Sequence, residues 1–171
     1  MPARHRPHPR AAASAGTAAV AFSLLEMTLV VATIAILAAI AIPRYADAIH
    51  RYRVEMAAKR VVADFALARA SARASGAGQV VDFSAPADGY TMAGLAAPDG
   101  RAGSYVVRLS DEPYKCTISS AAFGNVAPGT SSVRFTRYGT PEAGGSVVVS
   151  AGGYSRTVAL DPVTGSAEVL K

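Results

Sequence analysis

An almost unbroken apolar run at positions 21–43, AFSLLEMTLVVATIAILAAIAIP, constrains this chain more than any other feature of its sequence. Between Phe22 and Ile42 the only charged residue is Glu26, and only one serine and two threonines otherwise interrupt the hydrophobic residues. As an α-helix this stretch would span about 31 Å, which matches the ~30 Å apolar thickness of a bilayer. It is longer than the ~7–15 apolar residues of a secretory signal. We therefore predict a transmembrane helix over residues 22–43 that is retained as an anchor.

Residues 1–21 precede this run and show neither helical nor strand periodicity. They are rich first in Arg, His and Pro and then in Ala and Ser, so we interpret them as a leader. Three of the arginines behind the formal net charge of +5 lie here, so the charge is little reason to expect a nucleic-acid partner. Because basic residues precede the run and only Arg44 directly follows it, we expect a cytoplasmic N-terminus and a C-terminal part across the membrane.

Glu26 is out of place in a plain anchor. A carboxylate costs roughly 2.5–3.5 kcal/mol at the centre of a bilayer and less near its edge. Two interpretations stay open: Glu26 lies at the interface, where it is tolerated, or it meets a cation of a partner. An acidic residue in a membrane segment is by default a functional hypothesis.

The run resembles the N-terminal signature of type IV pilins and type II secretion pseudopilins. This resemblance implies that a prepilin peptidase cleaves between Ala21 and Phe22, and that the new N-terminal Phe22 is methylated. Glu26 then becomes the fifth mature residue and acts in filament assembly, and Pro43 matches the position of a helix kink. Ala21 departs from the family pattern, which usually has Gly there. Pairing of Glu26 with the new amine of another subunit would remove the cost of a lone carboxylate and fix the axial register.

Residues 44–75 contain neither Gly nor Pro and repeat apolar residues every three or four positions, so we predict an amphipathic helix that continues the anchor. Acid-to-base pairs at i,i+4 spacing, Asp47–Arg51 and Glu55–Lys59, support it. The stripe predicted to meet the rest of the fold consists of Ile42, Tyr45, Ile49, Tyr52 and Met56, followed by Val61, Val62, Phe65, Ala68 and Ala72.

Residues 76–171 hold 14 of the 15 glycines and alternate short β-prone runs with turns. We predict a globular β domain, with the last four strands in a meander, and an α+β fold in which the long N-terminal helix packs on this antiparallel domain. The predicted strands are 79–83, 90–95, 104–110, 115–119, 133–136, 146–150, 156–160 and 167–170.

The C-terminal part is similar to the minor pseudopilins called GspH/FimT-like. The similarity rests on the spacing of Phe135 and Gly139, on the Gly144–Gly145 hairpin and on the Thr164–Gly165 turn before the last strand. Together the two resemblances cover residues 21–73 and 133–170. They imply a pilin-like fold.

Residues that could carry catalysis or bind metals are few. The β domain contains no histidine, which excludes a Ser–His–Asp or Cys–His site there. The single cysteine, Cys116, excludes an intrachain disulfide, and we expect it to be a half-buried residue in the middle of a strand. We interpret six acidic residues as turn residues rather than Ca²⁺ ligands, because none has EF-hand spacing; they are Asp82, Asp88, Asp99, Asp111, Glu112 and Asp161. We therefore predict neither an enzyme nor a cofactor or metal site.

These observations predict a minor pilin or pseudopilin that is anchored in the bacterial inner membrane with its β domain in the periplasm. The resemblance implies the following partners: other pilin or pseudopilin subunits, the prepilin peptidase and methylase, the inner-membrane assembly platform and the lipid bilayer. Whether the filament is a type IV pilus or a type II secretion pseudopilus stays open. One alternative is a DNA-uptake pilin that binds DNA through Arg134, Arg137 and Arg156 on neighbouring strands, and another is a membrane-tethered domain that never polymerises.

Overall fold

The computed structural model describes residues 23–97, 104–124 and 131–170. The predicted leader, the predicted cleavage site between Ala21 and Phe22, and Asp99 lie outside these residues. The described chain divides into two units, one that ends at Ala41 and one that begins at Ile42, and each is described by itself.

A single helix, α1 (Leu24–Ser75), begins the described chain and runs for 52 residues through Pro43. At its start the Ser23 hydroxyl accepts a hydrogen bond from the Leu25 amide, 3.3 Å away, and Glu26 lies in the first turn, where a carboxylate complements the helix dipole. At its end Gly76 adopts a left-handed conformation with φ of 66°, which a glycine tolerates without strain.

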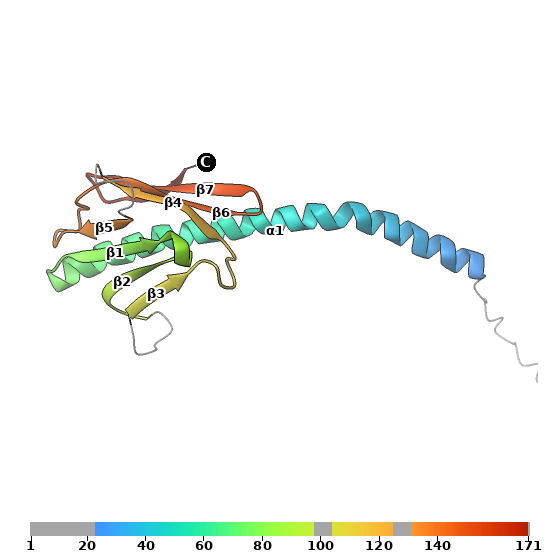
Figure 1. Cartoon of the computed structure of the whole chain (residues 1–171), viewed down its shortest axis with the longest axis horizontal. Coiled ribbons are helices and arrows are strands. Elements are labelled where there is room, and N and C mark those ends of the chain that lie inside the picture. Colours follow the sequence, from blue (N-terminus) through green and yellow to red (C-terminus); the bar gives the residue numbers. More distant parts are fainter. Residues whose placement is uncertain (1–22, 98–103, 125–130, 171) are drawn as a thin grey trace, which may run out of the picture. The chain divides into compact units, whose positions relative to one another are not determined.

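Two antiparallel four-stranded sheets follow the helix, so the predicted α+β fold is confirmed (Figure 1). The first has the strand order β3-β2-β1-β5 and the second β4-β6-β7-β8. A short 3₁₀ turn, η1 (Ala85–Ala87), joins the first two strands. The bounds are β1 Gln79–Ser84, β2 Gly89–Ala96, β3 Ser104–Arg108, β4 Thr117–Phe123, β5 Ser132–Phe135, β6 Gly145–Ala151, β7 Tyr154–Leu160 and β8 Ala167–Leu170.

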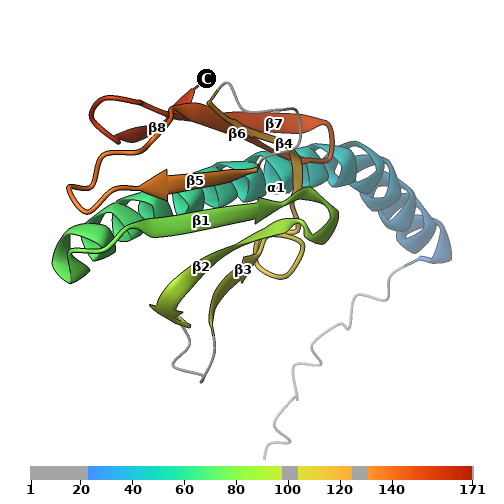
Figure 2. The ribbon, with the colours of Figure 1, turned by 60° about the vertical axis from the view of Figure 1, so that its left-hand side comes forward.

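The core lies between the C-terminal part of α1 and both sheets (Figure 2). Phe65 is 1% exposed, and its ring centroid lies 5.7 Å from that of Phe83 on β1, 6.1 Å from that of Phe123 on β4 and 6.2 Å from that of Phe135 on β5. One helical side chain thereby joins the two sheets. Such packing is worth more than the area it buries, because tilted and edge-on aromatic pairs attract each other.

The predicted meander of the last four strands is wrong for β5. The strands β6, β7 and β8 do form a meander, but β5 pairs with β1 in the other sheet, with Val81 opposite Val133. This pairing lets β5 bury Val133 and Phe135 in the core. The chain then turns at Gly139 and crosses to the second sheet. Strand β4 also starts later than predicted, so Cys116 precedes the strand instead of lying in its middle.

The predicted helix stripe is correct only in its second half. Val61, Phe65, Ala68 and Ala72 are buried, whereas the earlier stripe residues are exposed, with Tyr45 at 71%, apart from the half-buried Ile49. The buried face starts instead at the side chains Val54, Ala57 and Ala58. Residue 54 follows residue 52 by about 200° around a helix, so the core faces almost the opposite side from the exposed tyrosines. The small alanines allow the sheets to approach the helix closely.

Candidate functional site

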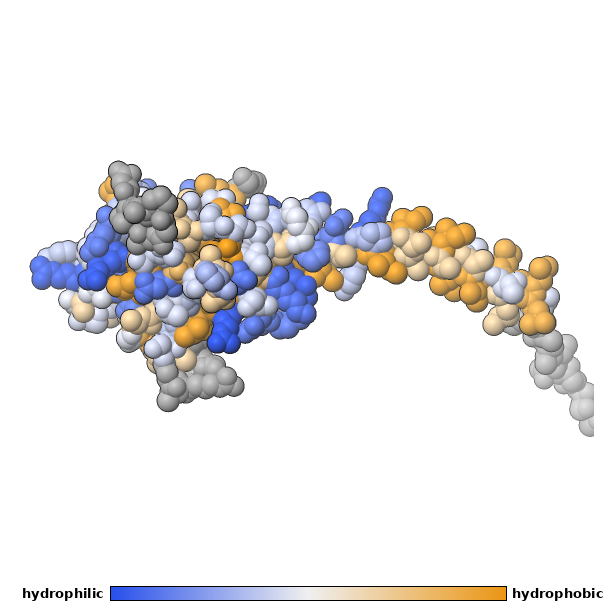
Figure 3. Space-filling model, viewed as in Figure 1, coloured by the Kyte–Doolittle hydropathy of each residue, from blue (hydrophilic) through white to orange (hydrophobic). Residues whose placement is uncertain are grey.

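The N-terminal part of α1 presents an apolar surface that the described chain does not cover (Figure 3). Its most apolar 18-residue window has a mean hydropathy of 2.4 and no buried residue, and this is the one described helix that is long and apolar enough to cross a membrane. The hydroxyls of Thr28 and Thr33 donate to the carbonyls of Leu25 and Val30, each at 2.8 Å. The segment therefore offers no unsatisfied hydroxyl donor, which suits an apolar environment.

The first turns of α1 carry a shallow apolar concavity on one face and an acidic residue, Glu26, that does not line it. An apolar concavity of about 380 Å³ is lined by Leu24, Met27, Thr28, Val31, Ala32 and Ala35. Alanine and threonine at i,i+3 and i,i+4 spacing allow another helix to approach closely. Glu26 is exposed and has no ion-pair partner among the described residues. Pro43 lies inside α1, with helix on both sides of it.

A buried polar cluster ties α1 to the first sheet, and sequence reasoning missed it. Asp64 is 5% exposed, and its carboxylate accepts hydrogen bonds from the hydroxyls of Tyr90 at 2.5 Å and Tyr105 at 2.7 Å. Arg60 donates to Asp64 at 3.0 Å and to the Tyr105 hydroxyl at 2.7 Å. The i,i+4 spacing of Arg60 and Asp64 was a visible signal, but nothing local in the sequence indicates the tyrosines.

The electrostatics of this cluster favour one protonation state. Burial, together with hydrogen bonding to the Asp64 carboxylate, raises the pKa of Tyr105 to about 12. Burial and the charge of Asp64 likewise raise the pKa of Tyr90 well above its usual range. Although burial opposes the charge of Arg60, attraction to Asp64 raises the pKa of this guanidinium. The cluster is thus a neutral pair of phenols around one ion pair, which suits fixing the sheet on the helix rather than acid–base catalysis.

The tip of the β6–β7 hairpin rests on α1. Gly152 has φ of 56° and packs against the His50 ring so closely that a Cβ there would overlap it. The Arg51 guanidinium lies 4.7 Å from the centroid of the Tyr154 ring and donates to the tyrosine hydroxyl at 3.2 Å. This hydrogen bond raises the pKa of Arg51. The contact of Arg51 with Tyr154 replaces the predicted Asp47–Arg51 pair as the main interaction of this arginine.

Glu55 connects the same hairpin to the helix. It pairs with Lys59 at 3.3 Å, as predicted, and with Arg156 of β7 at 3.2 Å. Hydrogen bonding from Lys59 lowers the pKa of Glu55.

The three arginines considered for DNA binding do not lie on neighbouring strands. Arg134 is on β5 and Arg156 on β7, and these strands belong to different sheets. Arg134 faces Glu142 at 3.8 Å, and Arg156 pairs with Glu55. Arg137 lies 4.8 Å from the ring centroid of Tyr138. Two of the three guanidinium groups therefore already face a carboxylate, and the set forms no continuous basic surface.

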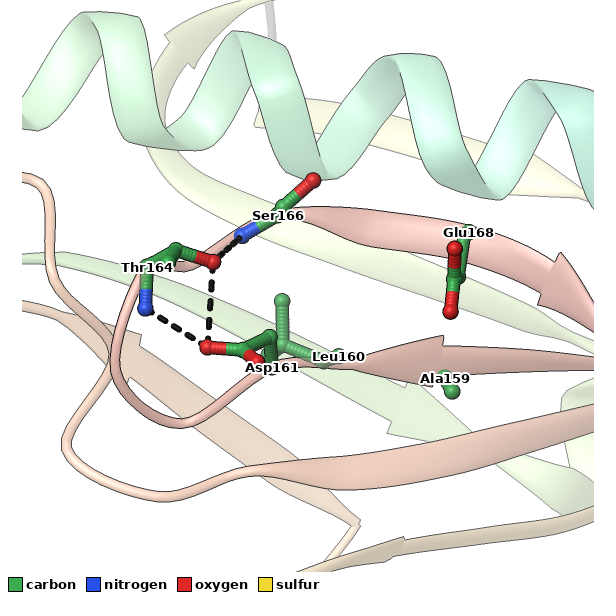
Figure 4. A pocket seen from close by; sticks show the side chains of 6 residues that line it. All are labelled: Ala159, Leu160, Asp161, Thr164, Ser166 and Glu168. Atoms are coloured by element: carbon green, nitrogen blue, oxygen red, sulfur yellow. Dashed lines mark hydrogen bonds between the residues drawn. The ribbon is translucent and has the colours of Figure 1, made fainter.

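Two of the acidic residues predicted to lie in turns, Asp161 and Asp88, accept hydrogen bonds from backbone amides, whereas Asp82 lies within β1 and not in a turn. One oxygen of Asp161 accepts hydrogen bonds from the amides of Val163 at 2.8 Å and Thr164 at 2.6 Å, and from the Thr164 hydroxyl, beside a cavity of about 260 Å³ (Figure 4). The Thr164 amide in particular lowers the pKa of Asp161. Asp88 accepts from the Ile118 amide at 2.9 Å. Over the described residues, no three His, Cys, Asp or Glu side chains could share a metal ion.

Cys116 is more buried than predicted, at 1% exposed. Its thiol lies 3.2 Å from the Tyr114 carbonyl, to which it donates, and burial raises its pKa. A protonated, enclosed thiol is a packing group and not a nucleophile.

Comparison with known proteins gives one match. The family described as type II transport protein GspH matches residues 57–164, more than half of the chain. The matched range begins within the buried part of α1 and ends in the turn before β8, so it includes neither the apolar segment nor Glu26. No curated protein and no solved structure matches the chain.

Proposed function

Because the chain belongs to the family of the type II transport protein GspH, and is thus a type II secretion pseudopilin, we propose that it acts as a minor subunit of a secretion pseudopilus. It contributes by polymerisation and contact and has no active site. The long apolar helix fits membrane anchoring. The sequence alone does not distinguish a type IV pilus from a secretion pseudopilus, and the family favours the secretion pseudopilus.

One observation carries this proposal. The N-terminal part of α1 exposes large hydrophobic side chains on all sides, from Leu24 at 86% to Ile42 at 67%. Exposing so many apolar side chains to water would cost free energy. A surface of this kind therefore needs a bilayer around it before assembly and neighbouring helices afterwards. A helix with this property, continuous with the core of a folded domain, suits transfer from a membrane into a filament.

The proposal includes processing at the start of the helix. A prepilin peptidase cleaves between Ala21 and Phe22, and the Phe22 amine is methylated. Mass spectrometry of the mature N-terminus tests this directly. An uncleaved chain in cells that process their other pseudopilins would contradict it and would favour the alternative of a tether that never polymerises.

Glu26 serves assembly in this proposal. Its carboxylate pairs with the N-terminal amine of a neighbouring subunit and thereby sets the axial register. We expect Glu26→Leu to insert into the membrane normally but to lose most of its incorporation into filaments. Glu26→Asp, which keeps the charge, is the matched control. Equal incorporation of Glu26→Leu and wild type, measured by cross-linking in sheared filaments, would defeat this role.

The remaining partners follow from the same proposal. The subunit enters the inner membrane with its N-terminus in the cytoplasm and the β domain in the periplasm, and the assembly platform extracts it into the filament. Protease protection of spheroplasts tests the topology, because the periplasmic β domain should be digested from outside. DNA uptake is not favoured, because Arg134 and Arg156 each face a glutamate.

A further inference from the structure

Three arginines gather around one turn at the end of the domain where α1 terminates. Arg69 and Arg73 lie one helical turn apart in the last turns of α1, and both lie against Gly139, which follows β5. Arg137 and Tyr138 belong to the same turn. We call these four side chains the arginine cluster. Figure 3 shows hydrophilic residues at this end of the domain.

The cluster has no carboxylate partner among the described residues. Other arginines of the domain do have one: Arg53 faces Glu112, Arg60 binds Asp64, and Arg156 binds Glu55. Arg69, Arg73 and Arg137 take part in no described ion pair, and the Nε atom of Arg69 is buried without a hydrogen-bond partner. The charges of these three guanidinium groups are thus not neutralised by a described carboxylate, so a carboxylate supplied from outside would be bound favourably by the exposed groups of Arg73 and Arg137.

The local backbone makes room for this arrangement. Gly139 is buried with φ of 78°, and the Arg73 guanidinium lies against it, in space that a Cβ would occupy. The Arg137 side chain stacks on Tyr138, which is 69% exposed, and donates to its hydroxyl at 2.7 Å. The stacking holds one guanidinium and one aromatic ring at the surface in a fixed relation, so less entropy is lost when a ligand binds.

We propose that the arginine cluster is a docking surface for a carboxylate-bearing segment of another protein. Arginine forks bind carboxylates through paired, charge-assisted hydrogen bonds, and Arg and Tyr are the residue types enriched in interface hot spots. The cluster is too small for a nucleic-acid strand, which needs a basic groove that follows the backbone.

Binding of a defined acidic probe tests the proposal on the full chain in detergent micelles. The probe is a fluorescein-labelled octaglutamate peptide, followed by fluorescence anisotropy at low and moderate salt. We expect saturable binding that the double variant R73Q/R137Q weakens at least tenfold. Both replaced side chains are exposed, so folding is expected to survive, and circular dichroism checks it. The matched control R44Q/R108Q removes the same charge from exposed arginines elsewhere and should stay within twofold of wild type.

Three results would overturn the proposal. They are no octaglutamate binding by the folded wild type, equal loss in the control variant, and tighter cluster-dependent binding of a labelled eight-nucleotide oligothymidylate. The last result would assign the surface to nucleic acid. Filament incorporation is not part of the readout, so failure of the proposed assembly role would leave this test unaffected.

Discussion

The two ends of helix α1 use hydrophobic residues in opposite ways. In the N-terminal part, large side chains such as Leu29 and Ile34 are at least 60% exposed. In the C-terminal part, Val54, Val61 and Phe65 are each 1% exposed beneath the two sheets. The first part takes its stabilising environment from outside the chain, whereas the second finds it within the same domain.

The difference lies in side-chain pattern more than in hydrophobicity. The N-terminal part is apolar all round, which is the property of a helix surrounded by lipid or by other helices. The C-terminal part is apolar on one face only, and that face carries alanines that admit a sheet. Mutations in the two parts should therefore have unequal effects on the stability of the domain.

Phe65→Ala should have the largest effect. The change removes a ring that contacts Phe83, Phe123 and Phe135, so it leaves a cavity between the helix and both sheets. We expect a loss of about 3–5 kcal/mol in the free energy of unfolding, measured by denaturant titration in detergent. Leu67→Ala is the control on the same helix, since Leu67 is 39% exposed. Equal losses in the two variants would remove the distinction between buried and exposed faces.

Asp64→Asn should have the next largest effect on the unfolding free energy. The amide keeps the shape but loses the charge that Arg60, Tyr90 and Tyr105 share, and we expect a loss of about 1–3 kcal/mol. Asp82→Asn, on the exposed side of β1, should change the unfolding free energy little. If Asp64→Asn leaves the unfolding free energy unchanged, the polar cluster does not fix the sheet on the helix.

Alanine substitutions at two neighbouring glycines test the contact between the β6–β7 hairpin and the helix. Gly152 and Gly153 both have positive φ, but only an alanine at position 152 would meet the His50 ring. We expect Gly152→Ala to be less stable than Gly153→Ala by about 1 kcal/mol, as read from thermal unfolding. If the two variants melt at the same temperature, the hairpin does not press on His50 in solution.

The buried polar cluster that joins α1 to β3 should also show a pH dependence. The pKa of Tyr105 is raised to about 12 from an ordinary value of 10.0, so its contribution to stability is complete below pH 10 and is lost as the pH rises through 12. We expect the wild type to lose stability more steeply than Tyr105→Phe between pH 10 and 12. Parallel pH profiles would contradict the assignment.

Leu29→Ala should have the smallest effect. Leu29 lies in the exposed apolar part, so the unfolding free energy of the β domain should change by less than about 0.5 kcal/mol. A loss comparable to that of Phe65→Ala would show that this part of the helix is stabilised by the domain itself.

Local sequence patterns predicted where the helix and strands lie better than they predicted which strands pair and which residues pack together. Glycine-rich turns bracket the strands, so all eight were found from sequence. The pairing of β5 with β1 was missed because strand order depends on which residues meet in the core, here Phe135 with Phe65. The predicted stripe lies on the wrong side of the helix at Tyr45 and Tyr52, because tyrosines at this spacing were counted as core residues. The alanines on the face that is actually buried gave no signal, because alanine is equally common on protein surfaces. Asp64 was missed because a polar residue is not expected in a core.

The placement of the core residues on α1 also determines the order in which the parts of the core are synthesised. The apolar face at residues 54–72 leaves the ribosome before any strand that covers it has been made, and β7, the last strand with fully buried side chains, ends at Leu160. The anchor is complete earlier still. If the proposed anchor inserts as it is made, the chain would reach the membrane while the inner face of its helix is uncovered, and the core would be complete only after the later strands have been made. During this interval the uncovered face is open to aggregation or to a chaperone.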